Sequence, residues 1–366
     1  MAASKTARLL NRPEDFERLG VSPNRIETWE DARRNRNTGK GQWEWWYFDS
    51  ILDDGSQAVA QFFTKAGLRK ANVATDAPGV TVQLTRPDGT EKKVCIDYKP
   101  EECSYGSDKC DVHMGRSEFV GDFKTYHIVT EEKDGVALDL TLTSRSKPYR
   151  PGSAYFGFEG DEYFTWLCCV PQGEVSGTVT MDGQTREVHG TGYHDHQWGN
   201  NSYVHEWNHW VWARQSFGDY SALVFDMVAS KEYGYKRFPI VFVQNNRGDV
   251  VFESIEGVNC DVLGEFEEKE ASGKVYPTGV HYEFEDSGKH LSYELREKRT
   301  LRAEGVKSLP LAARLAVKGL HLNLSYARFL ADGKMCLEIP GGQKIERSGE
   351  LIYEFMYPGE TFKGHM

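Results

Sequence analysis

The chain has 366 residues, 13% of them aromatic, and a formal net charge of −11. This length suits two domains, since domains usually hold roughly 100–200 residues each. An acidic surface repels phosphate backbones and anionic lipid, which argues against nucleic acid and membrane surfaces as partners. No stretch approaches the roughly 20 consecutive apolar residues of a membrane-spanning helix, so we expect no membrane insertion.

Cysteine usage and the first residues bear on the cellular compartment. The seven cysteines are an odd number and include the adjacent pair Cys168 and Cys169, which is not typical of a disulfide framework. Residues 1–16 are broken by charge every few positions and lack the apolar stretch of a signal peptide. We therefore expect reduced thiols and a cytoplasmic protein.

Residues 1–40 form a polar N-terminal extension in which a short helix is predicted after Pro13. From residue 41 onward, short alternating apolar runs are separated by Asp-Gly dipeptides. These predict β-hairpins, because type I′ turns need a positive φ at both central residues. The dipeptides are Asp54-Gly55, Asp88-Gly89, Asp134-Gly135, Asp182-Gly183 and Asp332-Gly333. Only residues 308–318, with a Ser and an early Pro, predict another helix, so the pattern favours an all-β fold of barrels or sandwiches.

An internal echo indicates that the β region is a tandem repeat. Residues 43–62 and 207–226 align at a constant offset, so that Trp46 corresponds to Trp210. In both copies an aromatic strand is followed by a Gly/Asp turn and an apolar strand. Two copies of one β unit explain the echo, and a chance likeness of two aromatic hairpins is the alternative. The predicted domains are residues 41–204 and 205–366.

The first segment suited to chemistry is the aromatic strand predicted at residues 43–49. Strand alternation gives two sets, with Trp43, Trp45, Tyr47 and Asp49 on one face and Glu44, Trp46, Phe48 and Ser50 on the other. Both faces are mostly aromatic and each carries a carboxylate, as expected for a strand with one packed side and one ligand-facing side. Plain core packing of the rings is the alternative.

The second segment is residues 193–200, where His194 and His196 are two positions apart and therefore share one face of a strand. Two imidazoles so placed can bind zinc with a third ligand such as Asp195. They can equally be held by hydrogen bonds that fix their tautomers, or they can be purely structural.

A zinc-protease string, His-Glu-x-x-His, occurs at residues 205–209. It binds metal only on a helix, where residues four apart meet on one face. Here His205, Glu206 and His209 run into the aromatic strand of the second hairpin, which would set the two histidines roughly 13 Å apart. We therefore predict no metal site at this string.

The third segment is the apolar strand at residues 221–227, which ends near Asp226. Aspartate is depleted from strands because its carboxylate needs water or polar partners. If Ala222, Val224 and Asp226 face a cavity, burial would raise the pKa of Asp226 and let it act as a general acid near neutral pH. The alternative is a strand that ends there, with Asp226 in solvent.

The motifs at residues 43–49 and 193–199 together resemble the carotenoid 1,2-hydratase and AttH-like group of the lipocalin superfamily, which includes kievitone hydratase and fungal decalin-forming Diels–Alderases. This resemblance implies two tandem lipocalin-like β-domains, each a barrel or sandwich, with a site at or near their junction. In the hydratases of the group, a His-x-Trp pair and a Tyr-x-Asp pair are held to carry the acid chemistry.

The first pair corresponds here to His196 and Trp198. The second corresponds only to Asp226, because Val224 stands where the tyrosine would be, and this departure argues against a carotenoid substrate.

The residues and the resemblance together predict a cofactor-independent acid/base enzyme that acts on a C=C bond of a hydrophobic, unsaturated small molecule, as a hydratase or a cyclase/isomerase. Asp226 would supply the proton, His196 would orient the acid or hold water, and the ring of Trp198 would stabilise a developing cation. The residues predicted to bind the substrate are Glu44, Trp46, Tyr47, Tyr193, His194, Trp210 and Arg214. No cofactor and no metal are expected.

Two other functions fit parts of the pattern. Lipocalin-type barrels often only carry ligands, so a non-catalytic carrier of a hydrophobic molecule is the main alternative. A zinc-dependent hydrolase would use His194 and His196, or the string at residues 205–209. Serine hydrolases and NAD enzymes are disfavoured, because the sequence has neither a Gly-x-Ser-x-Gly elbow nor a dinucleotide fingerprint.

Overall fold

The computed structural model describes most of the chain, namely residues 5–36, 39–65, 73–308, 314 and 324–359. The chain folds as two compact units. The first unit is Arg8–Ser202, and the second is Tyr203–Met366 together with Met1–Ala7. Within the described residues, no helix is both long enough and apolar enough to cross a membrane. All seven cysteines are free, as their number and spacing predict.

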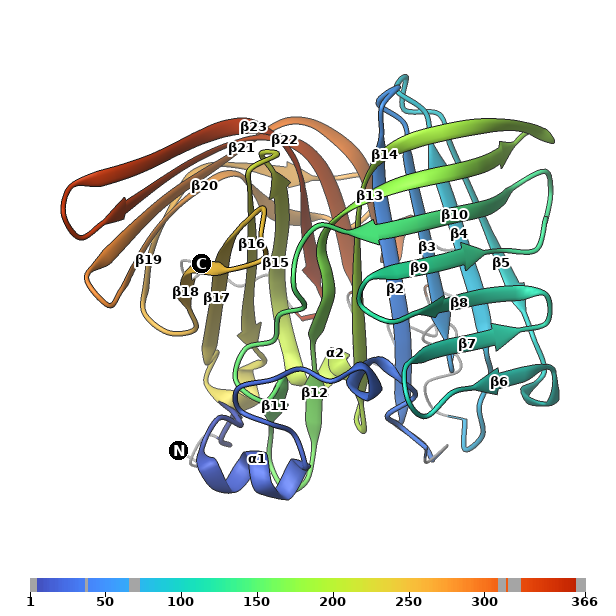
Figure 1. Cartoon of the computed structure of the whole chain (residues 1–366), viewed down its shortest axis with the longest axis horizontal. Helices are drawn as coiled ribbons and strands as arrows, with labels where there is room; N and C mark the ends of the chain where they lie inside the picture. The colour runs from blue at the N-terminus through green and yellow to red at the C-terminus, as the bar shows by residue number, and fades with distance from the viewer. Residues whose placement is uncertain (1–4, 37–38, 66–72, 309–313, 315–323, 360–366) are drawn as a thin grey trace. The chain divides into compact units, whose positions relative to one another are not determined.

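The first unit is built around one curled antiparallel sheet (Figure 1). Its strands are β1 (Arg8–Leu9), β2 (Trp43–Leu52), β3 (Gln57–Phe63), β4 (Gly79–Thr85), β5 (Glu91–Asp97), β6 (Cys103–Tyr105), β7 (Cys110–Met114), β8 (Ser117–Gly121), β9 (Thr125–Val129), β10 (Ala137–Ser144), β11 (Tyr155–Gly157), β12 (Tyr163–Thr165), β13 (Leu167–Met181) and β14 (Gln184–Gly199). Its short helices are α1 (Pro13–Leu19), η1 (Thr28–Asp31) and η2 (Pro100–Glu102).

The second unit is built around a second curled sheet. Its strands are β15 (Trp207–Ser216), β16 (Tyr220–Ala229), β17 (Arg237–Asn245), β18 (Val250–Ser254), β19 (Val258–Glu268), β20 (Lys274–Asp286), β21 (Lys289–Gly305), β22 (Ser325–Ile339) and β23 (Gln343–Tyr357). Its short helices are α2 (Tyr203–Glu206), η3 (Lys231–Tyr233) and η4 (Val306–Ser308).

Both sheets have the same connectivity, which confirms the predicted all-β tandem fold. The first sheet runs β5-β4-β3-β2-β14-β13-β10-β9-β8-β7-β6, and the second runs β18-β17-β16-β15-β23-β22-β21-β20-β19. In each unit the opening strand pairs with its hairpin partner on one side and with the last long strand on the other. The hairpins predicted from the internal echo are therefore the opening hairpins of the two units, β2–β3 and β15–β16.

The local turn predictions are mostly confirmed. Both residues of Asp134-Gly135 and of Asp182-Gly183 have positive φ, as a type I′ turn requires. Asp332-Gly333, by contrast, lies inside the long strand β22 and forms no turn. Position 333 favours glycine for a steric reason, because a Cβ there would collide with the side chain of Gln215.

Of the two predicted helices, the first is confirmed as α1. Pro13 occupies its first position, and Gly20 ends it with a left-handed φ of 67°. Most of the second, at residues 308–318, lies outside the described residues.

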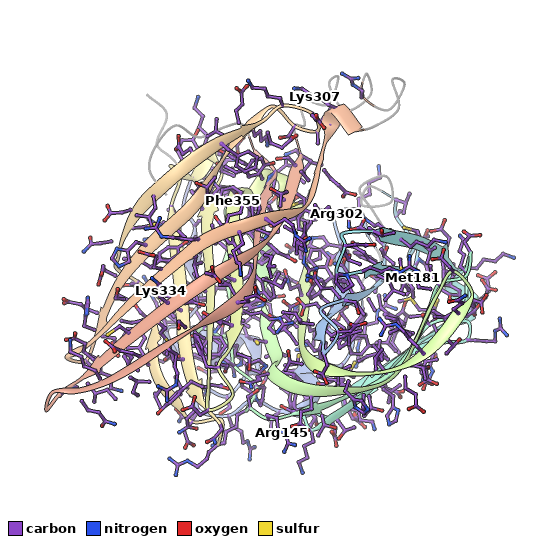
Figure 2. The ribbon with its side chains drawn as sticks, turned by 90° about the horizontal axis from the view of Figure 1, so that it is seen from above. Arg145, Met181, Arg302, Lys307, Lys334 and Phe355 are labelled. Atoms are coloured by element: carbon purple, nitrogen blue, oxygen red, sulfur yellow. The ribbon has the colours of Figure 1, made fainter. Side chains whose placement is uncertain are left out.

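Alternating residues of each opening hairpin face a hydrophobic core. In the first unit these include Trp46 and Phe48, as strand alternation predicts. In the second unit they include Val211 and Ala213. The last strands are divided in the same way, since Phe355 is buried in the core and Lys334 on β22 is exposed. Both residues are labelled in Figure 2.

The internal echo slips by one residue between the two strands of the hairpin. Phe62 pairs with Trp46 in the first unit, whereas the corresponding Asp226 pairs with Val211 in the second. The connection in the second hairpin, residues 217–219, is one residue shorter than residues 53–56 in the first. A one-residue shift turns a strand's side chains to the opposite face. Trp210 therefore lies outside the core position that Trp46 occupies.

We predict that Gly177→Asn lowers the free energy of unfolding by about 2 kcal/mol or more, because it introduces backbone strain and a clash. Gly177 has a φ of 136° within β13, and a Cβ there would collide with the carbonyl oxygen of Asp139. Urea unfolding followed by tryptophan fluorescence measures the change. The matched control is Gly183→Asn, at a turn with a φ of 72° and no atom within 4 Å of the added Cβ. Equal losses in the two variants would contradict the prediction.

Candidate functional site

The sequence-predicted residues of β2 and β14 divide between the two faces of these paired strands. His194 is opposite Phe48 and His196 is opposite Trp46 in the strand register. Their side chains lie on the face that carries the first unit's core, together with Glu44 and Trp198. The inner face therefore brings together five predicted site residues: Glu44, Trp46, His194, His196 and Trp198.

The inner face is organised around Asp31, the last residue of η1. Its Oδ2 accepts a hydrogen bond of 2.6 Å from the hydroxyl of Tyr126 and lies 3.2 Å from Nε2 of His194. Its Oδ1 lies 3.3 Å from Nδ1 of His196, an ion pair without the alignment of a hydrogen bond. Burial alone would raise the pKa of Asp31, but the two histidines hold it well below its usual range.

His196 is held between two carboxylates. Opposite Asp31, its Nε2 donates to Glu44 Oε1 at 2.8 Å. Glu44 also accepts hydrogen bonds from the backbone N–H groups of Arg34 and Asn35, at 2.7 and 2.8 Å. Burial would lower the pKa of His196, but the nearby charges of Asp31 and Glu44 and the hydrogen bond to Glu44 outweigh it and raise this pKa.

Aromatic rings enclose both histidines. The His196 ring stacks on Trp46 with centroids 4.6 Å apart, and Trp198 lies on it at 4.7 Å in a tilted arrangement. The ring of His194 contacts Phe119 and Tyr126, each at 4.6 Å. The Nδ1 of His194 donates to the carbonyl oxygen of Tyr47 at 2.9 Å, since a carbonyl can only accept. This bond directs Nε2 at Asp31.

Three buried residues of this face also offer potential metal ligands within 4.8 Å of one another: Asp31, Cys110 and His194. Each already has a partner, since Cys110 donates its S–H to the carbonyl of Phe119 and Asp31 pairs with His194. Burial raises the pKa of Cys110 well above its usual range, which favours the thiol over the metal-binding thiolate. The donor set fits a hydrogen-bonded network better than a metal centre.

The His-Glu-x-x-His string is not helical throughout. Glu206 is the last residue of α2, and β15 begins at Trp207. His205 thus lies on the helix and His209 on the strand, so the helical spacing that this zinc motif requires is absent, as predicted.

The opposite face of the same strands holds a second acid. Asp195 Oδ2 accepts hydrogen bonds from the hydroxyl of Tyr193 at 2.8 Å and from the indole N–H of Trp166 at 3.2 Å. Its Oδ1 accepts one from the amide of Gln197 at 3.2 Å. Asp195 is only 2% exposed. Burial raises its pKa to about 6, although these hydrogen bonds and nearby His194 act in the lowering direction.

Tyr47 and Tyr193, two predicted substrate-binding residues, lie on this outer face. Their rings meet edge to face with centroids 6.4 Å apart, and the Tyr47 hydroxyl donates to Asp49 at 3.3 Å. From the sequence alone, Asp195 was proposed only as a possible third zinc ligand beside His194 and His196. The available signal was its position between two polar neighbours, Tyr193 and Gln197, which alternation places on its own face.

The second unit contains the remaining predicted residues, Asp226, Trp210 and Arg214. Asp226 is buried on the core side of β16, and the Nε and Nη2 atoms of Arg237 donate to its two oxygens at 2.8 and 2.6 Å. The hydroxyl of Tyr282 adds a third bond at 3.2 Å. Trp210 is half-buried and Arg214 buried, and neither lies in the second unit's core cluster.

Comparison with known proteins gives a family and a fold. Residues 90–306 match the AttH-like family. A curated relative, the Diels-Alderase cheD of Chaetomium globosum, is 26% identical over 232 residues, which cover 60% of this chain and 52% of that protein. The chain thus spans about half the length of this relative.

Two solved structures share the fold. CghA, also solved with Sch210972, is 15% identical with a TM-score of 0.64, and the match covers 89% of this chain and 90% of that chain. Kievitone hydratase from Nectria haematococca is 12% identical with a TM-score of 0.53, and the match covers 90% of this chain and 94% of that chain.

We predict that Asp31→Asn lowers the free energy of unfolding at pH 7 by about 3–5 kcal/mol, because it removes the buried carboxylate that pairs with both His194 and His196. The folded-state pKa of Asp31 is depressed. Ionised Asp31 therefore contributes its full stabilisation of the folded state above the ordinary aspartate pKa of about 4, and this contribution is lost as the pH falls below that value. Urea unfolding between pH 3 and 7 should show a weaker acid-induced loss in the variant than in the wild type. The exposed Asp53→Asn is the control, and parallel pH curves for Asp31→Asn and the wild type would exclude this role.

Proposed function

The chain belongs to the AttH-like family, and we propose that it is an enzyme of hydratase or cyclase type that acts on a C=C bond of a hydrophobic, unsaturated small molecule. The names of the similar proteins, a Diels-Alderase and a hydratase, denote enzymes of these two reaction types. Side-chain acids suffice for such chemistry, so the proposed reaction uses no bound cofactor. A carboxylic acid protonates the double bond, and either water or a group of the same molecule then completes the product.

The proposal rests on Asp195. A carboxyl with a pKa of about 6 is protonated in part near neutral pH, so it can donate a proton and later recover one from water. The hydroxyl of Tyr193 and the indole N–H of Trp166 both point at Oδ2. These donors stabilise the carboxylate once the proton has left. The aromatic faces of Tyr193 and Trp166 suit the cation that forms on the substrate.

Asp226, the acid predicted from the sequence, forms an ion pair with Arg237. Both of its oxygens accept hydrogen bonds from the charged guanidinium of Arg237, whereas the side-chain donors that bind Asp195 are all neutral. We therefore assign the proton-donating role to Asp195, and Asp226 serves as the control residue in the experiments below. His196 and Trp198 are proposed to position β14, because the inner network fixes the strand whose other face carries Asp195.

Asp195→Asn is predicted to reduce turnover by about 100-fold or more, on the scale of general acid catalysis. Wild type and variant are each incubated with a metabolite extract of the source organism and, separately, with kievitone, and products are identified by mass spectrometry. A product heavier by one water indicates a hydratase, and one of unchanged mass indicates a cyclase or isomerase. Asp226→Asn is the matched control and should retain activity. An active Asp195→Asn beside an inactive Asp226→Asn would return the acid role to Asp226, and a compound that co-purifies unchanged with all three proteins would support a carrier.

The pH profile of kcat/KM should fall as the pH rises through about 6, because Asp195 must be protonated to act. Tyr193→Phe should move this descending limb to higher pH, since the lost hydroxyl stabilised the carboxylate and so lowered its pKa. The limb should stay in place in Asp226→Asn. A limb that moves in Asp226→Asn and not in Tyr193→Phe would oppose the assignment.

A further inference from the structure

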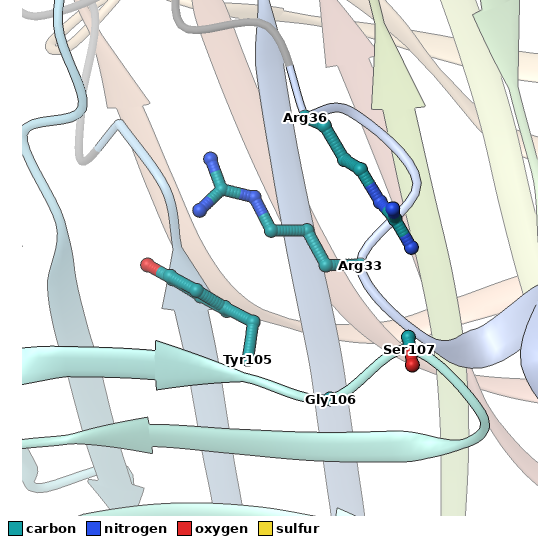
Figure 3. A pocket seen from close by; sticks show the side chains of 5 residues that line it. All are labelled: Arg33, Arg36, Tyr105, Gly106 and Ser107. Carbon is teal, nitrogen blue, oxygen red and sulfur yellow. The ribbon is translucent and has the colours of Figure 1, made fainter.

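A pocket of about 350 Å³ lies in the first unit, apart from Asp195 and its partners. Its lining residues are Arg33, Arg36, Tyr105, Gly106 and Ser107 (Figure 3). The two arginines follow η1, and the other three residues lie at the end of β6 and directly after it. Two guanidinium groups in one pocket contrast with the net charge of −11 of the whole chain.

The two arginines have different surroundings. Arg33 donates to Asp76 at 2.6 Å, and its guanidinium carbon lies 4.3 Å from the centre of the Tyr105 ring. Arg33 is thus fixed in place with its charge largely balanced. Arg36 is exposed and forms no ion pair with any residue that the structure describes. The pocket therefore carries one positive charge that is not neutralised by a neighbouring described side chain, and Figure 3 shows the two side chains on the same side of the β6 segment.

One wall of the pocket belongs to a stack of flat groups. The Tyr105 ring stacks on Trp46 with centroids 6.0 Å apart and planes inclined by 23°, and Trp46 in turn stacks on His196 at 4.6 Å. Arg33 covers the outer face of Tyr105. This stack makes the wall rigid, because each ring is held on both sides, and the planar guanidinium offers a flat surface to a ligand.

From this combination we propose that the pocket binds a conjugated or aromatic carboxylate. The carboxylate pairs with Arg36, whose planar fork of N–H donors matches its two oxygens. The flat remainder of the ligand packs against the guanidinium of Arg33 and the rim of Tyr105. Binding at this site does not depend on the proposed activity, because none of its residues contacts Asp195 in the described structure.

Cinnamate is a suitable probe, and cinnamyl alcohol is its neutral counterpart of similar shape. Isothermal titration calorimetry of the full chain should detect cinnamate binding that weakens with added salt, and should give much weaker binding of the alcohol. Arg36→Gln should weaken cinnamate binding about tenfold, the scale of one hydrogen-bonded charge. Because Arg36 is exposed, this substitution leaves the core untouched.

Two control variants separate this site from the rest of the molecule. Arg116→Gln removes an arginine whose side chain is 85% exposed elsewhere in the first unit and should leave cinnamate binding unchanged. Asp195→Asn should also bind cinnamate normally, so a failure of the proposed activity is distinguishable from a failure of this site. The proposal is overturned if cinnamate does not bind, if the alcohol or inorganic phosphate binds as tightly, or if Arg36→Gln and Arg116→Gln behave alike.

Discussion

Asp31 reaches from a short 3-10 helix into the interior of the first sheet, where it contacts two histidines and a tyrosine. A second carboxylate, Glu44, binds one of these histidines, His196. Two carboxylates and two imidazoles at this place can balance one another's charge, which is the condition under which ionised groups tolerate burial. The network also joins parts of the chain that are distant in sequence. Asp31 belongs to the N-terminal segment, whereas His194 and His196 belong to β14 and Glu44 to β2. The segment that carries Asp31 is thus tied to the sheet by buried side-chain contacts and is more than a polar extension.

The geometry of a β-strand links this network to the proposed acid. His194, Asp195 and His196 are consecutive, so the strand turns the histidines to one face and the aspartate to the other. A charged network anchors the inner face, and a desolvated carboxyl with three hydrogen-bond donors lies on the outer face. A slip of one residue in the pairing of β14 would exchange the two faces. The buried ion pairs oppose that slip, and they thereby keep Asp195 where Tyr193 and Trp166 can reach it.

Local patterns in the sequence were sufficient for the features that depend on neighbouring residues. Alternation predicted the shared face of His194 and His196, and the echo of two aromatic hairpins predicted a tandem all-β fold. The features that the sequence did not predict depend on contacts between residues that are not neighbours in the chain. Nothing near Asp31 indicates that its partner is His194, 163 positions away, and nothing near Asp226 indicates Arg237 and Tyr282 as its partners. The Asp332-Gly333 dipeptide failed as a turn signal for the same reason, because a tertiary contact with Gln215 requires the glycine.

The two units also show why roles cannot be transferred from one copy of a repeat to the other. Position 226 in β16 corresponds to Phe62 in β3, a core position that an aromatic ring fills in the first unit. Placing a carboxylate there requires a cation, and Arg237 supplies it. The shorter hairpin connection of the second unit shifts the register of β15 against β16 by one residue. Val211 therefore takes the position opposite Asp226 that Trp46 has opposite Phe62 in the first unit. Because Val211 has no aromatic ring, the stack of Trp46 on His196 in the first unit has no counterpart at this position of β15. The two units therefore share the repeated fold, but the inner network of Asp31, Glu44 and the two histidines belongs to the first unit. The acid chemistry proposed for Asp195 depends on residues of that same unit.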